Sequence, residues 1–396
     1  MEELTTTRVH SRTNDKTSVF SDAQLTDLAT AAKSTGTSLS TLKQIHRGVD
    51  AFMKLVALVR ASNPGVFVQA GLGSAEDPTP WIVFTDHPGD AVQRQLEQLP
   101  TDVDVLVGAP ANESELDLQV EALVAALGAQ DGIQSASAGV VEKGLTIKVS
   151  YTREQPQNGG GIPAESMTIT HQALNAVAGK FADGELPVTV QFQESSDPIS
   201  TSEAIRGGRD LNRADDNVAE CTAGFAVDRN GERGILTAQH CRTGLRYQSS
   251  LGVIQYVTAA RNSKSGRTDL QFHRKLPDIS ITKQFRATGT ASSDDRTVDA
   301  AVNPVVGQTA CHWGRTTGYS CSTIESTNFC VDYANWEVAC NLDSTVTQID
   351  QPGDSGGPWF LGTTAIGIHS GGGAGMSLFT RIGAATDFLD ATVQQQ

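Results

Sequence analysis

The sequence has few basic residues and no long apolar run. It contains 30 Lys and Arg against 45 Asp and Glu, which gives a formal net charge of −15 and a pI near 4.9. Binding along a nucleic-acid backbone needs clustered cations that displace counterions, so this balance argues against a nucleic-acid partner. No segment approaches the roughly 20 apolar residues that cross a bilayer, so no membrane attachment is expected either.

Cysteine is absent from the first half of the chain. All six cysteines lie in the second half: Cys221, Cys241, Cys311, Cys321, Cys330 and Cys340. Residues 1–200 hold 25 acidic and 13 basic side chains, a net charge of −12, whereas residues 201–396 hold 20 and 17, a net charge of −3. No Cys-x-x-Cys pair suggests zinc, and an even count suits disulfides in an oxidising compartment. We therefore expect two dissimilar parts joined near residue 200; the alternative is six reduced thiols in a cytosolic protein.

The N-terminus shows no secretory signal peptide, although disulfides imply export. Residues 1–21 are rich in Thr, Ser and charge, and the best apolar stretch, at 51–59, is interrupted by Lys54. Three explanations stay open: a leader already removed, a start placed too late, or another export route.

Periodicity of apolar residues predicts a small α+β unit in the first half. Helices are expected at 22–61 with a break near Gly36, and at about 90–98, 113–127 and 171–181. Strands are expected at 81–85, 103–107, 133–137, 145–151 and 188–192. Gly159–Gly161 lack the flanking strand and Lys of a phosphate-binding loop.

The second half follows a polar, turn-rich segment at 194–217 and has a different pattern. Short β-type runs lie at 224–227, 234–238, 252–257, 270–272, 365–368 and 377–380. Such strands indicate an all-β sandwich or barrel, and an amphipathic helix is expected at 384–393.

Three motifs of the second half supply the groups of a serine nucleophile. They read GILTAQHC at 234–241, TDLQFH at 268–273 and PGDSGGP at 352–358. A nucleophilic serine needs an imidazole to take its proton and a buried carboxylate to hold the tautomer of that imidazole. His240, Asp269 and Ser355 provide these groups in the chymotrypsin order, not the subtilisin or α/β-hydrolase order.

Glycines around Ser355 fit an oxyanion hole. Backbone N–H groups must point at the developing oxyanion, and side chains would obstruct the tight turn that presents them. We expect the N–H groups of Gly353 and Ser355 to be the donors, with Gly356 and Gly357 allowing close packing behind the nucleophile.

Together these motifs resemble the chymotrypsin-like serine peptidases of the streptogrisin and α-lytic protease group, over about residues 203–390. IRGG at 205–208 resembles a mature N-terminus, and CTAGF at 221–225 and CHWGRTTGYSC at 311–321 resemble parts of disulfide loops. The resemblance implies pairs Cys221–Cys241 and Cys311–Cys321, which leaves Cys330 with Cys340; the residues alone allow fifteen pairings.

The resemblance also implies the fold and the function of the chain. It implies an α+β pro-region followed by an all-β chymotrypsin-like double β-barrel with a C-terminal helix. Residues 1–65 would be the helical start of the pro-region, 66–203 its α+β part, and 204–396 a trypsin-like serine protease domain. The chain would be a secreted serine endopeptidase, made as a zymogen, that hydrolyses peptide bonds through an acyl-enzyme.

Partners and the rival function follow from the same resemblance. Protein and peptide substrates are expected, with the chain's own pro-region as intramolecular chaperone and inhibitor. We expect a monomer without a metal or organic cofactor. The rival is a catalytically silent homologue that serves as a binding or adhesion protein.

Substrate contacts are implied for GIHSGGG at 367–373. Ser370 would support Asp269, and the backbone of Ser370, Gly371 and Gly372 would bind the substrate as an added strand. His369 resembles the histidine with which glutamyl endopeptidases bind an acidic side chain, which implies a preference for Glu or Asp before the scissile bond.

Two other preferences for the side chain before the scissile bond stay open. Cleavage of the chain itself after Glu203, close to IRGG, would agree with the acidic preference. Asp350 favours a basic side chain, and small or medium apolar side chains are a third possibility.

The sequence departs from the family pattern in three places. Gln239 replaces the usual small residue before the histidine, and the family's disulfide beside the serine is missing. The segment at 373–377 is short, which implies a reduced wall of the specificity pocket. Asp354 should be buried and need a cationic partner, for which His312 and Arg315 are the candidates.

Overall fold

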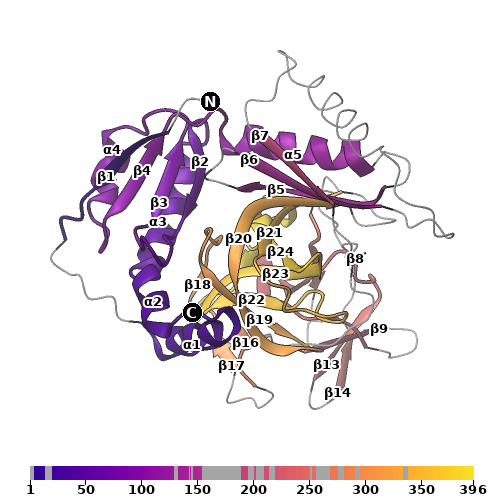
Figure 1. Ribbon diagram of the computed structural model, residues 1–396. Coiled ribbons are helices and arrows are strands. Elements are labelled where there is room, and N and C mark those ends of the chain that lie inside the picture. The colour runs from indigo at the N-terminus through magenta and orange to yellow at the C-terminus, as the bar shows by residue number, and fades with distance from the viewer. Residues whose placement is uncertain are drawn as a thin grey trace. The chain divides into compact units, whose positions relative to one another are not determined.

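The computed structural model describes residues 4–13, 20–128, 133–141, 143, 146–153, 189–194, 200–201, 209–213, 219–249, 252–255, 268–274, 281–289, 295–332 and 338–396. The chain forms two compact units (Figure 1). The first comprises Met1–Thr17, Arg47–Ile199 and Ser326–Cys340, and the second comprises Ser18–His46, Ser200–Glu325 and Asn341–Gln396. Among the described residues, no helix combines the length and the apolar character needed to cross a membrane.

A four-stranded sheet in the order β1-β4-β3-β2 forms one part of the first unit. Its strands are β1 (Thr5–Val9), β2 (Phe67–Gly71), β3 (Trp81–Phe84) and β4 (Val103–Val107). The strand β3 is apolar and buried along its whole length, as expected for an inner strand with both faces covered. The described part of this unit contains the helices α3 (Val49–Ser62), α4 (Asp90–Leu96) and α5 (Glu113–Gly128).

A second set of strands in this unit includes the far end of a strand from the second half of the sequence. The strands β5 (Ile133–Val141) and β6 (Thr146–Arg153) pair antiparallel, and β7 (Thr189–Glu194) pairs parallel with β6. The end of β20 (Gly318–Asp332) pairs with β5, with Cys330 opposite Ala138. The helix expected at 171–181 and the glycines at 159–161 lie outside the described residues.

The second unit consists mainly of short strands. They are β8 (Ser200–Thr201), β9 (Asp210–Arg213), β10 (Ala219–Thr222), β11 (Ala226–Arg229), β12 (Glu232–Thr237), β13 (Leu245–Ser249), β14 (Gly252–Gln255), β15 (Gln271–Arg274), β16 (Gln284–Arg286), β17 (Asp295–Thr297), β18 (Ala300–Ala301), β19 (Thr309–Gly314), β21 (Ala339–Thr345), β22 (Pro358–Leu361), β23 (Thr364–Gly373), β24 (Met376–Arg381) and β25 (Thr392–Val393). Two sheets have the orders β10-β9-β13-β14 and β15-β12-β11-β25, and a third contains β19-β22-β23-β24-β21. The closing helix α7 (Ala384–Leu389) ends earlier than predicted.

The short segment at 373–377 is a tight hairpin between β23 and β24. Gly373 pairs with Met376, and the two residues between them, Ala374 and Gly375, have φ of 51° and 81°. Positive φ at both central residues matches the right-handed twist of the flanking strands, so the connection needs no more residues.

Two short helices from the start of the chain belong to the second unit. They are α1 (Asp22–Thr35) and α2 (Leu39–Ile45). The continuous helix expected at 39–59 is wrong, because Gly48 adopts φ of 71° and α3 begins anew at Val49. The side chain of Ser21 caps α1 in a reciprocal capping box with Gln24.

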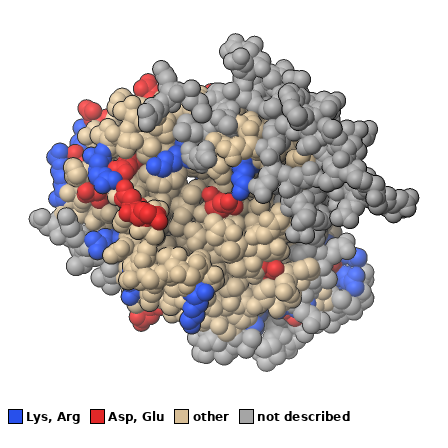
Figure 2. Space-filling view, viewed as in Figure 1, with Lys and Arg blue, Asp and Glu red and all other residues tan. Residues whose placement is uncertain are grey.

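Charged side chains are unevenly spread over the face seen in Figure 2. Lys, Arg, Asp and Glu mix over α4 and β1 of the first unit, whereas the described surface of the second unit carries few of them there. The structure contains the disulfides that the resemblance implied, Cys221–Cys241, Cys311–Cys321 and Cys330–Cys340.

A buried histidine on β15 predicts acid sensitivity of the fold. His273 is 1% exposed, neither ring nitrogen has a hydrogen-bond partner among the described residues, and burial lowers its pKa to about 4. Between pH 6.5 and 4 only the unfolded chain binds the proton, so stability is complete above pH 6.5 and falls as the pH drops to 4. The unfolding free energy should fall when the pH is lowered from 7 to 4. We expect this fall to be about 3 kcal/mol smaller in His273→Phe than in the parent chain.

Urea unfolding measures this difference, in chains that carry Ser355→Ala so that the expected peptidase activity cannot digest them. The exposed His87 provides the control, because His87→Gln should keep the acid sensitivity of the parent. Equal acid loss in the parent and in His273→Phe would contradict the assignment to His273.

Candidate active site

The three chemical groups expected from the motifs meet in one hydrogen-bonded chain. His240 Nε2 lies 2.8 Å from Ser355 Oγ, and His240 Nδ1 lies 2.7 Å from Asp269 Oδ2. The backbone N–H of His240 also donates to Asp269 Oδ1 at 2.9 Å. Both contacts of the ring are within the range needed for direct proton transfer, so the arrangement can deprotonate a serine hydroxyl.

Asp269 is completely buried but is well hydrogen-bonded. Ser370 Oγ donates to Asp269 Oδ2 at 2.5 Å, the contact expected for Ser370. Burial by itself would raise the pKa of Asp269, but the nearby His240 and the hydrogen bonds from His240 and Ser370 outweigh it and lower the pKa. The carboxylate therefore stays ionised and fixes the Nδ1–H tautomer of His240.

The loop that carries His240 is held by two groups besides Asp269. His240 lies three residues after the end of β12, and the neighbouring Cys241 forms the disulfide to Cys221. Gln271 Nε2 donates to the carbonyl oxygens of Ala238 at 2.8 Å and Cys241 at 3.0 Å. Gln239 does not displace the imidazole, and sequence reasoning missed the role of Gln271, which only its place two residues after Asp269 could have suggested.

The turn that carries Ser355 needs its glycines. Gly353 has φ of 117° and Gly356 has φ of 87°, in the region that glycine adopts most easily. A Cβ on Gly356 would lie 2.0 Å from Thr237 Oγ1, and a Cβ on Gly357 would lie 2.5 Å from the carbonyl oxygen of Trp313. The close packing behind the nucleophile expected from PGDSGGP is therefore present.

Thr222 fixes the same turn from the neighbouring strand β10. Its N–H donates to the Ser355 carbonyl at 2.7 Å, and its hydroxyl donates to the Gly353 carbonyl at 3.2 Å. Thr237 in turn donates to the Thr222 carbonyl at 2.8 Å. Sequence reasoning did not single out either threonine, although both lie inside the quoted motifs.

The buried Asp354 is held by neutral hydrogen-bond donors among the described residues, and of its two expected cationic partners His312 interacts with it electrostatically. Its carboxylate accepts hydrogen bonds from the N–H groups of Thr316 and Gln351 at 2.8 and 3.0 Å and from the Thr317 hydroxyl at 2.8 Å. Arg315 instead forms an ion pair with Asp210 at 2.8 Å. Neutral donors from a tight turn can satisfy a buried carboxylate, and no sequence pattern had marked them.

A strand from the same chain occupies the edge expected to bind substrate. Within β23, Gly372 pairs antiparallel with Ser200, and Gly371 pairs with Thr201 of β8. Ser355 has no solvent-exposed surface in this chain. The backbone of Gly371 and Gly372 can therefore bind an added strand. The paired residues of that strand, Ser200 and Thr201, lie three and two residues before Glu203.

His369 lies in a buried cluster with aromatic rings and a carboxylate. Its Nδ1 accepts the indole N–H of Trp359 at 3.3 Å, its ring stacks with that of His312 at 5.5 Å, and its Nε2 lies 3.6 Å from Asp350 Oδ2. Ser377 donates a short hydrogen bond to Asp350. Burial would raise the pKa of Asp350, but His369, Ser377 and His312 together lower it.

The Asp350 carboxylate also lies against the strand edge. A Cβ on Gly372 would lie 2.2 Å from Asp350 Oδ1, so no larger residue fits at 372. A negative charge and an imidazole therefore lie side by side next to the residues expected to hold the substrate.

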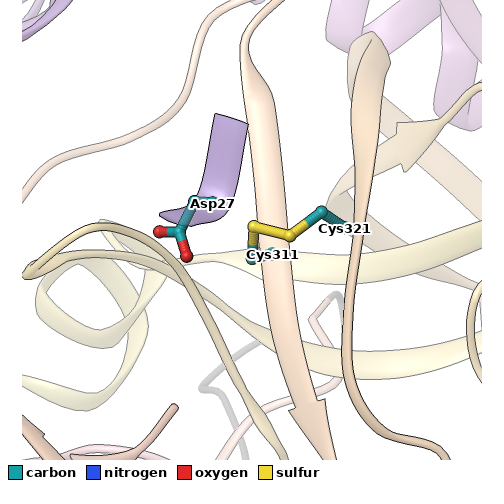
Figure 3. A group of neighbouring side chains, drawn as sticks. All are labelled: Asp27, Cys311 and Cys321. Carbon is teal, nitrogen blue, oxygen red and sulfur yellow. A yellow bond between two sulfur atoms is a disulfide. The ribbon is translucent and has the colours of Figure 1, made fainter. Parts of the chain in front are cut away.

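A grouping of metal-ligand type occurs on the second unit, at Asp27, Cys311 and Cys321 (Figure 3). The two sulfur atoms are joined in a disulfide and cannot act as thiolate ligands. This grouping therefore gives no support for a metal site.

Comparison with known proteins agrees with these motifs. The trypsin family model matches residues 205–392. Glutamyl endopeptidase 2 of Streptomyces griseus is 30% identical over 186 residues, which are 44% of this chain and 93% of that protein. Streptogrisin-A of Streptomyces griseus is 27% identical over 251 residues, 61% of this chain and 74% of that protein.

A solved structure of a glutamic acid specific serine protease, described as using a histidine triad in substrate binding, aligns at 26% identity. The alignment covers 48% of this chain and all of the solved chain, with a TM-score of 0.40. The family match and the curated relatives together lead to one conclusion: this chain belongs to the trypsin family and is a chymotrypsin-like serine endopeptidase.

Proposed function

We propose that Ser355, His240 and Asp269 hydrolyse peptide bonds through an acyl-enzyme. The observation that carries this proposal is the continuous chain of contacts from Ser355 Oγ through His240 to Asp269. Ser355 attacks the scissile carbonyl while His240 takes its proton and then delivers it to the leaving amine. Asp269 holds the tautomer and stabilises the imidazolium, and water deacylates the enzyme by the reverse route.

The N–H groups of Gly353 and Ser355 would stabilise the oxyanion. Donors fixed in advance lower the barrier because they need no reorganisation when charge develops. Support comes from the glycine conformation at Gly353 and from the two hydrogen bonds by which Thr222 holds this turn. The rival of a silent homologue would lead us to expect a missing or displaced member of this set.

The chain would be a secreted zymogen whose first part, residues 1–203, assists folding and inhibits the protease domain at 204–396. Support comes from β8, which occupies the edge of β23, and from the complete burial of Ser355. The similarity to Streptogrisin-A covers 61% of this chain, which is more than residues 205–396 can hold, so it reaches into the first part. Three disulfides fit an oxidising compartment.

For the side chain before the scissile bond, we propose a preference for Glu or Asp, with His369 as its partner. The buried position of His369 on β23 and the similarity to Glutamyl endopeptidase 2 support this preference. The Asp350 carboxylate, 3.6 Å from His369, favours the second candidate, a preference for Lys or Arg. The two candidates predict opposite effects when the charge of Asp350 is removed.

Maturation of the full chain tests both proposals. We expect a new N-terminus at Ala204 and faster cleavage of reporter peptides after Glu than after Lys. Asp350→Asn removes a like charge, so it should raise kcat/KM for the Glu reporter about tenfold, which is about 1.4 kcal/mol in the transition state. The exposed Asp299 gives the matched control, since Asp299→Asn should change neither reporter.

The contrary results are distinct. A preferred Lys reporter whose cleavage is lost in Asp350→Asn would establish the basic preference. A mature start elsewhere than Ala204 together with poor cleavage after Glu would overturn the acidic one, and an active chain that is never cut would overturn the zymogen proposal.

A further inference from the structure

The helices α1 and α2 share a hydrophobic core with the protease strands. Leu28, Ala31 and Leu42 are buried in the same cluster as Phe360 of β22 and Phe225. A Cβ on Gly362 would lie 2.8 Å from the side chain of Gln24, so the helix packs closely on the turn after β22. These helices are therefore built into the second unit, although they precede residue 204 by more than a hundred residues.

A single carboxylate on α1 is completely enclosed by donors from the protease domain. Asp27 has no exposed surface. Arg296 donates to both of its oxygens, at 2.9 and 3.0 Å, and the Tyr319 hydroxyl donates at 2.5 Å. The backbone N–H of Gly362 adds a fourth hydrogen bond at 2.6 Å. A bidentate guanidinium with two further donors is a built carboxylate site.

The surroundings make this site dependent on its carboxylate. Asp27 lies next to the Cys311–Cys321 disulfide (Figure 3), and the Arg296 guanidinium lies 5.4 Å from the centre of the Phe360 ring. Burial and the Asp27 carboxylate raise the pKa of Tyr319, so its hydroxyl stays a donor. An Arg side chain in such surroundings is costly without a counter-ion.

Two weaker contacts extend the attachment along the helices. His46 Nε2, at the end of α2, accepts the N–H of Thr309 at 2.8 Å, and the Ser34 hydroxyl donates to the Cys321 carbonyl at 2.9 Å. Among the residues that the structure describes, none of the partners of Asp27, Ser34 and His46 belongs to the proposed catalytic or substrate-binding set.

We propose that Arg296, Tyr319 and the N–H of Gly362 form a carboxylate-binding exosite of the protease domain, whose ligand is Asp27 on the helix α1. The exosite fastens the N-terminal helices to the protease through contacts that do not involve the substrate edge at β23. Attachment of the first part of the chain and inhibition by it are thus separate functions, borne by α1 and β8 respectively. This last division rests on the proposed zymogen.

Hydrogen exchange on the full chain carrying Ser355→Ala tests the exosite. In Asp27→Asn we expect amides of 22–45 to exchange at least about 100-fold faster, while amides of β23 and β24 keep their protection. Asp22, an exposed acid in the first turn of the same helix, gives the control, since Asp22→Asn should leave the exchange unchanged. Unchanged protection of 22–45 in Asp27→Asn would overturn the proposal.

Chemical rescue separates a carboxylate site from simple packing. In Asp27→Ala, 100 mM acetate should restore part of the lost protection of 22–45, whereas 100 mM chloride should not. Equal effects of the two salts would show that the site does not recognise a carboxylate. Because a Ser355→Ala chain cannot cut itself and no wild-type enzyme is added here, these outcomes do not depend on cleavage near residue 203. A wild-type chain that is never cut would overturn the zymogen proposal alone.

Discussion

Replacement of Ser355 by Ala should lower kcat about 10⁶-fold, the largest effect we expect from any single side chain. The reason is the complete loss of the nucleophile, which leaves only water and the oxyanion donors. The measurement is peptide-reporter hydrolysis by matured enzyme, with the variant matured by added wild-type enzyme that is then removed. Labelling by a serine-directed phosphonate should disappear in the same variant.

The double variant provides the control. Because Ser355 and His240 act as one unit, Ser355→Ala with His240→Ala should be no slower than Ser355→Ala alone. Residual activity within tenfold of wild type in Ser355→Ala, or undiminished phosphonate labelling, would mean that another group is the nucleophile.

Asp269→Asn should lower kcat about 10⁴-fold at neutral pH with little change in KM. The amide can donate to His240 Nδ1, which favours the Nε2–H tautomer and removes the acceptor that Ser355 needs. The observed contacts at 2.7 Å to His240 and 2.5 Å to Ser370 leave the substituted side chain in the same place. A kcat profile over pH 6 to 10 and a separate KM determination measure the effect.

A variant of Ser370, whose hydroxyl supports Asp269, shows whether the loss in Asp269→Asn comes from the wrong His240 tautomer or from a displaced side chain. Ser370→Ala removes one hydrogen bond but keeps the carboxylate, so it should cost far less than Asp269→Asn. Equal losses in the two variants would assign the effect to displacement of the loop.

The catalytic motifs were readable because chemistry constrains them tightly. His240, Asp269 and Ser355 lie in separate segments, but each segment has the residue types that the reaction needs, and the glycines beside Ser355 have backbone or packing reasons visible in the structure. The strands β3 and β4 were equally predictable from the sequence, because the short apolar runs WIVF and VDVLV bury their side chains most readily as strands of a sheet.

What could not be predicted depends on partners distant in sequence. Asp354 is satisfied by Thr316 and Thr317 in a turn, which no local pattern reveals. Asp27 looks like an ordinary polar position on an amphipathic helix until Arg296, 269 residues later, is brought beside it. The break before α3 is caused by one glycine, Gly48, in a segment whose apolar spacing continues without interruption.

The Cys221–Cys241 bond ties together the two halves of the proton relay. Cys241 follows His240, and Cys221 precedes Thr222, the residue that holds the Ser355 turn by two hydrogen bonds. Base and nucleophile thus share one covalent brace that forms only where thiols are oxidised. In a chain whose thiols stay reduced this brace is absent, so we expect weaker restraint of both His240 and the Ser355 turn under reducing conditions.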